Sequence, residues 1–232
     1  MSYILECRNL TKRYDRVTAL DNVSFAIESG KIVGLLGPNG SGKTTLIKLI
    51  NELLTPTSGE LLVDGKAPGA ETKAVVSYLP DATYLDMNDT VDSVINMFCD
   101  FYADFDRDRA YNMLARLQVD PHSRLKTMSK GTKEKVQLIL VMSRRAKLYV
   151  LDEPIAGVDP AARDYILKII MENYNEGSTI LISTHLIADI EGILDHVLFI
   201  KEGKIILQSD KSAIVDSQGK TVDQYFREVF AC

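Results

Sequence analysis

A glycine-rich stretch of nine residues constrains this chain more than any other feature. It reads Gly37-Pro38-Asn39-Gly40-Ser41-Gly42-Lys43-Thr44-Thr45. The apolar run that precedes it, Ile32 to Leu36, is typical of a buried strand. Leucine and isoleucine recur at helical spacing from Lys43 to Leu54, which predicts a helix. A strand, a glycine-rich turn and a helix in this order are the context in which a chain cradles phosphate.

The chemistry of such a loop follows from its backbone. Glycines let N–H groups turn inward around an anion, and the start of the helix adds unpaired donors and partial positive charge. We expect Lys43 to reach the β- and γ-phosphates of a nucleotide and the Thr44 hydroxyl to bind Mg²⁺. The alternative is a glycine turn before a lysine-bearing helix. Such a chance match has odds on the order of one in a hundred in a chain this long, so we predict a nucleotide site.

Size and composition restrict the remaining possibilities. The 232 residues suffice for one large domain or for a core with a small subdomain. The net charge of −5 argues against nucleic acid as the main partner. The sequence has no signal-peptide pattern and no apolar run of membrane-spanning length, so we expect any membrane role to require another polypeptide. The scattered Cys7, Cys99 and Cys232 indicate reduced cytosolic thiols rather than disulfides or a zinc site.

Strand patterns flank the glycine-rich stretch. Tyr3 to Arg8 and Val23 to Ile27 predict a small antiparallel sheet, and Val75 to Leu79 predicts a later strand. Between the first two, a polar turn from Thr11 to Asp15 holds one aromatic residue, Tyr14. Its ring could stack on a flat adenine, a contact worth about 1–3 kcal/mol. The alternative, which the residues alone favour, is a half-buried tyrosine on a strand edge.

Helical patterns replace strand patterns between residues 84 and 128. Val91 to Tyr102 has apolar residues at helical spacing, and Asp106 is a candidate N-cap of a second helix. The large apolar side chains of the first helix either form the core of this segment or an exposed patch for a partner. Ser129 and Gly131 then precede a long helix, which we expect over Lys133 to Arg145. They are a second candidate anion site or a simple N-cap.

Two later strands end in polar residues. Leu148 to Leu151 is followed by Asp152 and Glu153, and adjacent carboxylates at the tip of a core strand are costly without a cation or a functional partner. Asp152 suits a Mg²⁺ ligand, and Glu153 suits a base that polarises a water. Thr179 to Ile182 is followed by His185, which we expect at the same sheet edge. Beyond residue 210 the apolar spacing predicts one amphipathic helix.

These segments, taken together, resemble the ATP-binding subunit of ABC transporters over nearly the whole chain. Gly37 to Thr45 resembles Walker A, and Leu148 to Glu153 resembles Walker B with its catalytic glutamate. The resemblance makes Tyr14 the adenine-stacking aromatic residue, Asp159 the D-loop aspartate and His185 the switch histidine. It also implies a P-loop NTPase α/β core with an antiparallel β subdomain and an inserted α-helical subdomain.

The resemblance further implies how the domain is divided and used. The core would comprise residues 1–84 and 129–210, the helical subdomain residues 85–128 and a helical tail residues 211–232. ATP, with Mg²⁺ at Thr44, Asp152 and Asp81, would lie between the Walker A loop of one subunit and Ser129 and Gly131 of another. The chain would be the ATP-hydrolysing motor of drug or peptide export, on the cytoplasmic face of a membrane, bound to integral membrane subunits.

Two positions depart from the family pattern. Asp81 stands where the family usually has glutamine, and it adds a charge on a shorter side chain. Lys130 stands where the signature usually has glycine, and it would be strained by roughly 1–2 kcal/mol if that position required a positive φ. These departures leave a mainly non-catalytic switch in a heterodimer as one alternative. A soluble ABC-type ATPase acting on DNA or ribosomes is another, although such proteins usually carry coiled coils or two ATPase units.

Overall fold

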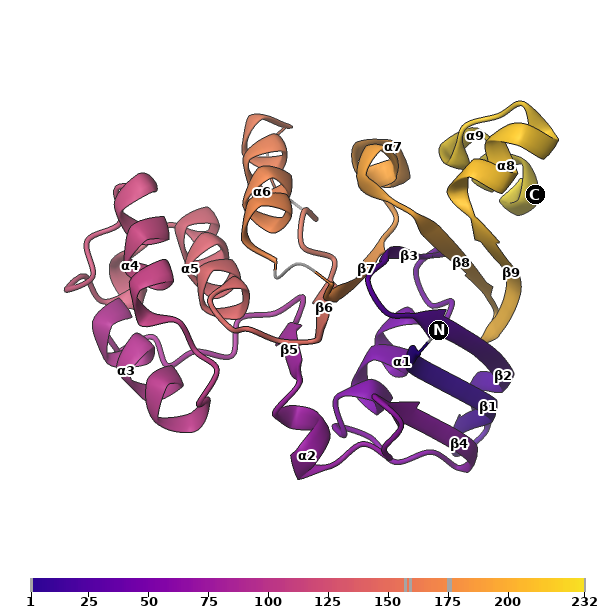
Figure 1. Cartoon of the computed structure of the whole chain (residues 1–232), viewed down its shortest axis with the longest axis horizontal. Helices are drawn as coiled ribbons and strands as arrows, with labels where there is room; N and C mark the ends of the chain where they lie inside the picture. Colours follow the sequence, from indigo (N-terminus) through magenta and orange to yellow (C-terminus); the bar gives the residue numbers. More distant parts are fainter. Residues whose placement is uncertain (1, 157, 159, 175–176, 232) are drawn as a thin grey trace.

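A six-stranded sheet forms the centre of the molecule in the computed structural model, which describes residues 2–156, 158, 160–174 and 177–231. Its strand order is β5-β6-β7-β3-β8-β9 (Figure 1). The strands are β3 (Ile32–Leu36), β5 (Val76–Leu79), β6 (Leu148–Asp152), β7 (Thr179–Thr184), β8 (His196–Lys201) and β9 (Lys204–Asp210). All are parallel except β9, which forms a hairpin with β8. Both faces are covered, which explains the unbroken apolar runs in the sequence.

The antiparallel β sheet predicted near the N-terminus is also present. It contains β1 (Tyr3–Tyr14), β2 (Val17–Glu28) and β4 (Ser58–Val63), in the order β2-β1-β4. The prediction of a polar turn from Thr11 to Asp15 was wrong, because Lys12 and Arg13 still pair with β2 and β1 continues to Tyr14. The chain reverses at Asp15, where φ is 46°, and Arg16.

Helix α1 (Lys43–Ile50) lies between the two sheets (Figure 1). Its apolar side chains pack with one face of the large sheet and with the small sheet; they are Leu46, Ile47, Leu49 and Ile50. The helix is shorter than predicted because the chain leaves it at Asn51, and Glu52 has a φ of 57°. Leu53 is consequently 57% exposed instead of continuing the buried stripe.

Apart from the short α2, which precedes β5, the remaining helices cover the other face of the sheet or form a group at one end of the molecule (Figure 1). The end group contains α3 (Val91–Phe101), α4 (Arg107–Arg116) and α5 (Lys130–Met142), and Asp106 caps α4 as predicted, by accepting from the Arg109 N–H. Helix α5 begins three residues earlier than expected because Ser129 caps it, and it ends three residues earlier, at Met142. The other helices are α6 (Pro160–Asn173), α7 (Ile187–Ile190) and the short α2 (Ala70–Lys73), with 3₁₀ turns at Leu125–Thr127 and Glu191–Ile193.

The C-terminal tail contains two helices where one was predicted. They are α8 (Lys211–Gln218) and α9 (Val222–Phe230), separated at Gly219, whose φ of 61° ends α8. Phe226 meets Phe199 of β8 edge-on, and Phe230 stacks on Phe226 with centroids 4.1 Å apart. The tail therefore covers the end of the sheet near β8.

Two predictions about the whole chain concern membranes and domain boundaries. Among the described residues no helix is both long enough and apolar enough to cross a bilayer. Helix α5 packs against α3 and α4 as well as β5, so it joins the helical group to the sheet. The boundaries at residues 85, 129 and 211 stay predictions.

Candidate functional site

Parallel strands bring the predicted site residues to one edge of the large sheet. Gly37 follows β3, Asp81 follows β5, Glu153 follows β6 and His185 follows β7. The register places Asp152 opposite Ser183, on the neighbouring strand. Ligand sites in open parallel sheets lie at this carboxyl edge. The fold therefore collects residues that are more than a hundred positions apart in the sequence.

The glycine-rich loop can exist only without side chains at two of its positions. A Cβ on Gly37 would lie 2.3 Å from the Ile200 carbonyl oxygen, and one on Gly42 would lie 2.7 Å from that of Ala19. Gly40 and Gly42 also have φ values of 79° and 111°, which favour glycine. Glycine at these positions is thus a requirement of packing and backbone shape.

The same loop presents unpaired donors. The backbone N–H groups of Gly40, Gly42 and Thr44 donate to no residue in the described part of the chain. The Ser41 hydroxyl is likewise buried without a partner there. A helix N-terminus with free N–H groups carries partial positive charge and binds anions. The loop residues, Gly37, Pro38, Asn39, Gly40, Ser41, Gly42, Lys43, Thr44 and Thr45, fit a phosphate chain.

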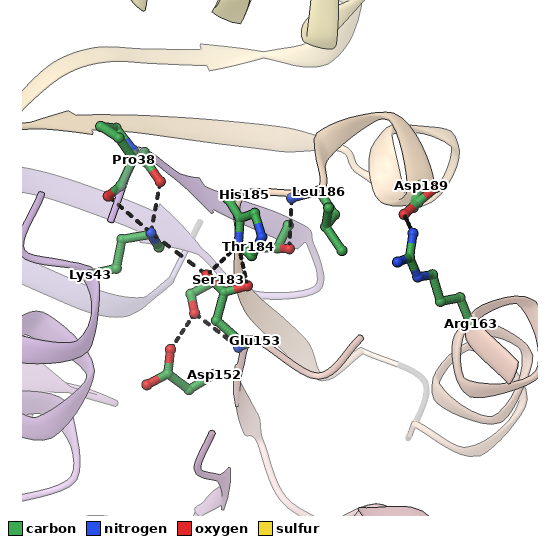
Figure 2. Close-up of polar contacts among 11 residues, drawn as sticks. Pro38, Lys43, Asp152, Glu153, Arg163, Ser183, Thr184, His185, Leu186 and Asp189 are labelled. Carbon is green, nitrogen blue, oxygen red and sulfur yellow. Dashed lines mark hydrogen bonds and ion pairs between the residues drawn. The ribbon is translucent and has the colours of Figure 1, made fainter. Parts of the chain in front are cut away.

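Lys43 is buried at the mouth of this loop. Its Nζ donates to the Gly37 carbonyl at 2.7 Å and to the Pro38 carbonyl at 3.2 Å (Figure 2). The Glu153 carboxylate lies 3.7 Å away. Burial lowers the pKa of Lys43 more than the nearby carboxylates raise it. A partly desolvated ammonium of this kind gains much from an additional anionic partner.

Asp152 has one satisfied oxygen and one free oxygen. Ser183 Oγ donates to Asp152 Oδ1, whereas Oδ2 is buried and receives no hydrogen bond from any described residue (Figure 2). Burial raises the pKa of Asp152, and the hydroxyls of Ser183 and Thr44 offset this only in part. An orphaned carboxylate oxygen beside a threonine hydroxyl suits a hard cation such as Mg²⁺. No cluster of three or more His, Cys, Asp or Glu able to hold a metal by itself exists within the described ranges.

Glu153 sits in a constrained position beside His185. Its φ is 50°, and its N–H donates to the carbonyl and hydroxyl oxygens of Ser183 at 3.0 and 3.2 Å. Its carboxylate contacts His185 Nδ1 at 3.0 Å (Figure 2). The side chain of Glu153 is 15% exposed and that of His185 45% exposed. A fixed carboxylate paired with an imidazole at the rim of a cleft can accept a proton from water.

A cleft of about 560 Å³ lies beside these groups, and its wall includes Asn39 of the glycine-rich loop, the loop after β5 and part of α5. Asp81, Asp152, Glu153 and His185 all line it. The sequence interpretation missed Ser183, although counting the register of two parallel strands from His185 would have placed it opposite Asp152. It also missed that Lys130, Glu134 and Gln137 of α5 line this cleft.

Comparison with known proteins identifies the family of the chain. Residues 20–156 match the family model of the ABC transporter. The chain belongs to the ABC transporter family. Its relatives include the uncharacterised ABC transporter ATP-binding protein YcbN of Bacillus subtilis, which is 30% identical over 96% of this chain and 74% of its own. The SkfA peptide export ATP-binding protein SkfE of the same organism is 30% identical over 88% of this chain and 87% of its own.

A solved structure of an ATP-binding subunit of an ABC transporter has the same fold. It superimposes with a TM-score of 0.87 at 28% identity, over 97% of this chain and 99% of its own. The resemblance drawn from the motifs is therefore confirmed: this protein is an ATP-binding ABC subunit and an ATPase with a P-loop α/β fold.

The signature region of this ABC ATPase lies at the start of α5, and its Lys130 lines the same cleft as Asn39 of the glycine-rich loop. Ser129 Oγ accepts from the Thr132 N–H at 3.1 Å, so the hydroxyl caps α5. Gly131 has open space around its Cβ position. Lys130 lies in α5 and has no positive φ, so the strain considered for this position is absent. Its ammonium pairs with Glu134 at 3.8 Å.

Two further residues, Tyr14 and Asp159, were assigned to family motifs in the sequence. Tyr14 ends β1, is 41% exposed, and has the Lys12 ammonium 5.2 Å from its ring centroid. Its ring is thus available to stack on a flat base. Asp159, assigned to the D-loop, lies outside the described residues. Nearby, Arg163 of α6 pairs with Asp189 of α7 at 2.7 Å (Figure 2).

Proposed function

We propose that this ABC ATPase hydrolyses MgATP at the edge of the large sheet and so drives transport through separate membrane subunits. The observation that carries the proposal is the set of unsatisfied groups at the carboxyl edge of the large sheet. The N–H groups without a described partner and the Lys43 ammonium are suited to bind an anion, and Asp152 Oδ2 is suited to bind a cation. Each group alone costs folding stability, and together they are complementary to a magnesium-bound triphosphate.

Each residue of the proposed site has its own role in the reaction. Glu153 accepts a proton from the water that attacks the γ-phosphorus, and ADP leaves as the bond to the γ-phosphate breaks. His185 holds the Glu153 carboxylate in place and stabilises charge on the γ-phosphate together with Lys43. Thr44, Asp152 and Asp81 would hold Mg²⁺, which would neutralise part of the phosphate charge. Tyr14 stacks on adenine.

A second subunit completes the site. Ser129 and Gly131 lie at the exposed start of α5, and neither of them lines the cleft of their own subunit. In a head-to-tail dimer they would meet the triphosphate on the glycine-rich loop of the partner. One subunit alone offers only part of the donors that a triphosphate needs. ATP then binds the closed dimer better than the open one and links two copies, or two related chains.

A hydrophobic groove beside the helical group suits a membrane partner. It has a volume of about 690 Å³, and its wall includes Tyr84, Met97 and Phe101, which are 49%, 39% and 77% exposed. Exposed apolar patches of this kind mark protein contacts. We infer that cytoplasmic helices of the membrane subunits dock here, which places the protein at the inner face of the membrane. The relative SkfE is named for peptide export, and we propose export of a peptide or drug for this chain as well.

The test is ATP turnover by Glu153→Gln. The amide cannot accept the proton, so we expect kcat to fall by roughly 10²–10⁴-fold while affinity for ATP, measured by nucleotide fluorescence, is kept. Lys43→Ala is the complementary variant, and it should weaken nucleotide binding itself. Wild-type turnover by Glu153→Gln would remove Glu153 from its role.

A second experiment tests the transport role. We expect the protein to co-purify with an integral membrane subunit, and Phe101→Glu to abolish that association without changing ATP affinity. Association with ribosomes or DNA instead would favour a non-transport ABC ATPase. No hydrolysis by the purified wild type would favour a nucleotide switch.

A further inference from the structure

The turn between β8 and β9 contacts both parts of the proposed nucleotide site. It consists of Glu202 and Gly203, and β9 runs beside β2 of the small sheet (Figure 1). The Gly203 N–H donates to the Ser41 carbonyl of the glycine-rich loop at 2.9 Å, and the Gly203 carbonyl accepts from the Asp21 N–H of β2 at 2.9 Å. A single residue therefore joins the glycine-rich loop to the small sheet.

The small sheet carries the aromatic residue of the proposed site. Tyr14 ends β1 and pairs with Val17 of β2, and Ala19 follows two positions later on the same strand. The Ala19 carbonyl oxygen would lie 2.7 Å from a Cβ on Gly42 of the loop and 2.7 Å from a Cβ on Gly203. The two glycines thus pack against the same carbonyl of β2. The distance from Tyr14 to the glycine-rich loop depends on this contact.

Gly203 cannot be replaced without a shift of β2. Its φ is 76°, and the three atoms nearest to an added Cβ all belong to Ala19 and Leu20. A methyl group at this position would therefore displace β2. Gly65, which follows β4, has nearly the same φ of 74°, yet a Cβ there would meet no described atom within 4 Å. The close approach to β2, and not the backbone conformation, distinguishes Gly203.

We propose that Gly203 is a positioning residue for nucleotide binding, which sets the distance between the adenine-stacking ring of Tyr14 and the phosphate-binding loop. This proposal rests on the proposed function, in which Tyr14 contacts the base and the loop contacts the phosphates. One nucleotide spans both contacts, so both contribute fully only when their separation matches the ligand. Gly203 acts through β2 and the loop, and it needs no contact with the nucleotide.

The experiment compares Gly203→Ala with Gly65→Ala, using MgATP and magnesium tripolyphosphate as ligands in calorimetric titrations. Tripolyphosphate can occupy the glycine-rich loop but has no base. We expect Gly203→Ala to bind ATP roughly 5- to 150-fold more weakly, the range of one base–aromatic stack, and to keep its affinity for tripolyphosphate. Gly65→Ala adds the same methyl group at nearly the same φ, so its affinity for both ligands should equal that of the wild type.

A double-mutant cycle connects the effect to the base. If Gly203 positions Tyr14, the variant that combines Gly203→Ala with Tyr14→Ala should bind ATP about as weakly as Tyr14→Ala alone, because the stack is already lost. Single losses that multiply in the double variant would place Gly203 outside the adenine contact and overturn its role.

Hydrogen exchange in the wild type is a second measurement, and it does not depend on how well Gly203→Ala folds. The probe is the Asp21 N–H, which donates to the Gly203 carbonyl. Stacking of the base favours the state in which β2 is held by Gly203, and coupling of this kind is reciprocal. Saturating ATP should therefore slow exchange of the Asp21 N–H more than saturating tripolyphosphate does.

Three further outcomes would overturn the role given to Gly203. They are wild-type affinity for ATP in Gly203→Ala, equal losses of affinity for ATP and tripolyphosphate, and equal slowing of Asp21 N–H exchange by the two ligands. If Tyr14→Ala weakens ATP binding and any of these is found, only the role of Gly203 is overturned. If Tyr14→Ala binds ATP as the wild type does, the adenine contact of the proposed function fails, and the role of Gly203 fails with it.

Discussion

At the scale of single residues, the buried carboxylate of Asp152 is a binding group that lowers the stability of the fold. One oxygen accepts from Ser183, and the other is buried without a partner in the described structure. Burial raises the pKa of this carboxyl above the ordinary value of 3.8. The charged form is thus less stable in the folded nucleotide-free protein than in the unfolded chain.

Replacing Asp152 by Asn should therefore stabilise the nucleotide-free protein and impair its activity. The amide keeps the Ser183 contact and removes the buried charge, so we expect the free energy of unfolding at pH 7 to rise by about 1–3 kcal/mol. Because the pKa is raised, the cost is absent below pH 3.8 and complete above the folded-state pKa. The difference between variant and wild type should grow as pH rises through that interval, as measured by urea unfolding.

We expect the same variant, Asp152→Asn, to lose Mg²⁺-dependent ATP turnover. Asp152→Asn should need more Mg²⁺ for half-maximal ATPase activity. A variant that is less stable than the wild type at pH 7 would contradict the assignment of a buried, unpaired charge.

At the scale of elements, Arg144 joins the helical group to the sheet. It follows α5 and is 2% exposed. Its guanidinium pairs with Asp104, between α3 and α4, and donates to the carbonyls of Lys73, Ala74 and Val76 before and within β5. The Tyr102 ring lies 3.9 Å from it. One side chain therefore ties together the helical group, β5 and the wall of the hydrophobic groove.

Removing this side chain should be costly. Arg144→Leu leaves a carboxylate and several carbonyls without their donor, so we expect the free energy of unfolding to fall by about 3–5 kcal/mol. The adjacent Arg145 is the control, because its side chain is 67% exposed and pairs with Asp106 at the surface. Arg145→Leu should cost only about 0–1 kcal/mol. Equal losses in the two variants, measured by denaturant unfolding, would refute the role given to Arg144.

At the scale of the whole molecule, the site is divided between two regions of the surface. The glycine-rich loop follows β3, whereas Ser129 begins α5 in the helical group at the end of the molecule (Figure 1). In the proposed head-to-tail dimer, Ser129 and Gly131 of a second chain would complete the set of donors around each triphosphate. Assembly and catalysis are then linked through the ligand.

The Glu153→Gln variant should accordingly dimerise when ATP is added. ATP that is bound but not cleaved holds the closed state, so we expect the mass from light scattering to double with MgATP and to return to the monomer value with ADP. Adding Ser129→Glu places a carboxylate against the phosphates and should abolish the dimer. A monomer in Glu153→Gln with saturating ATP would exclude a homodimer and leave a pair of unlike chains as the form to test.

The sequence by itself determined the local parts of this protein: the glycine-rich loop, the strands around it, the caps at Asp106 and Ser129, and the order of motifs that indicated the family. These depend on neighbours in the chain, through backbone freedom, periodicity and side-chain capping. The sequence misjudged where α1 and α5 end, and it merged α8 and α9. Helix ends depend on the backbone conformation of single residues such as Glu52 and Gly219. The periodicity of apolar residues gives no information about that conformation.

Only the tertiary structure decided how the parts meet. The parallel register placed Ser183 against Asp152, and the packing of α5 along β5 brought Gln137 into the cleft. The positive φ of Glu153 and the burial of Asp152 likewise arise from contacts between distant segments. Such features carry no local signal, because the cost of an unpaired or strained group depends on its surroundings in space and not on its neighbours in the chain.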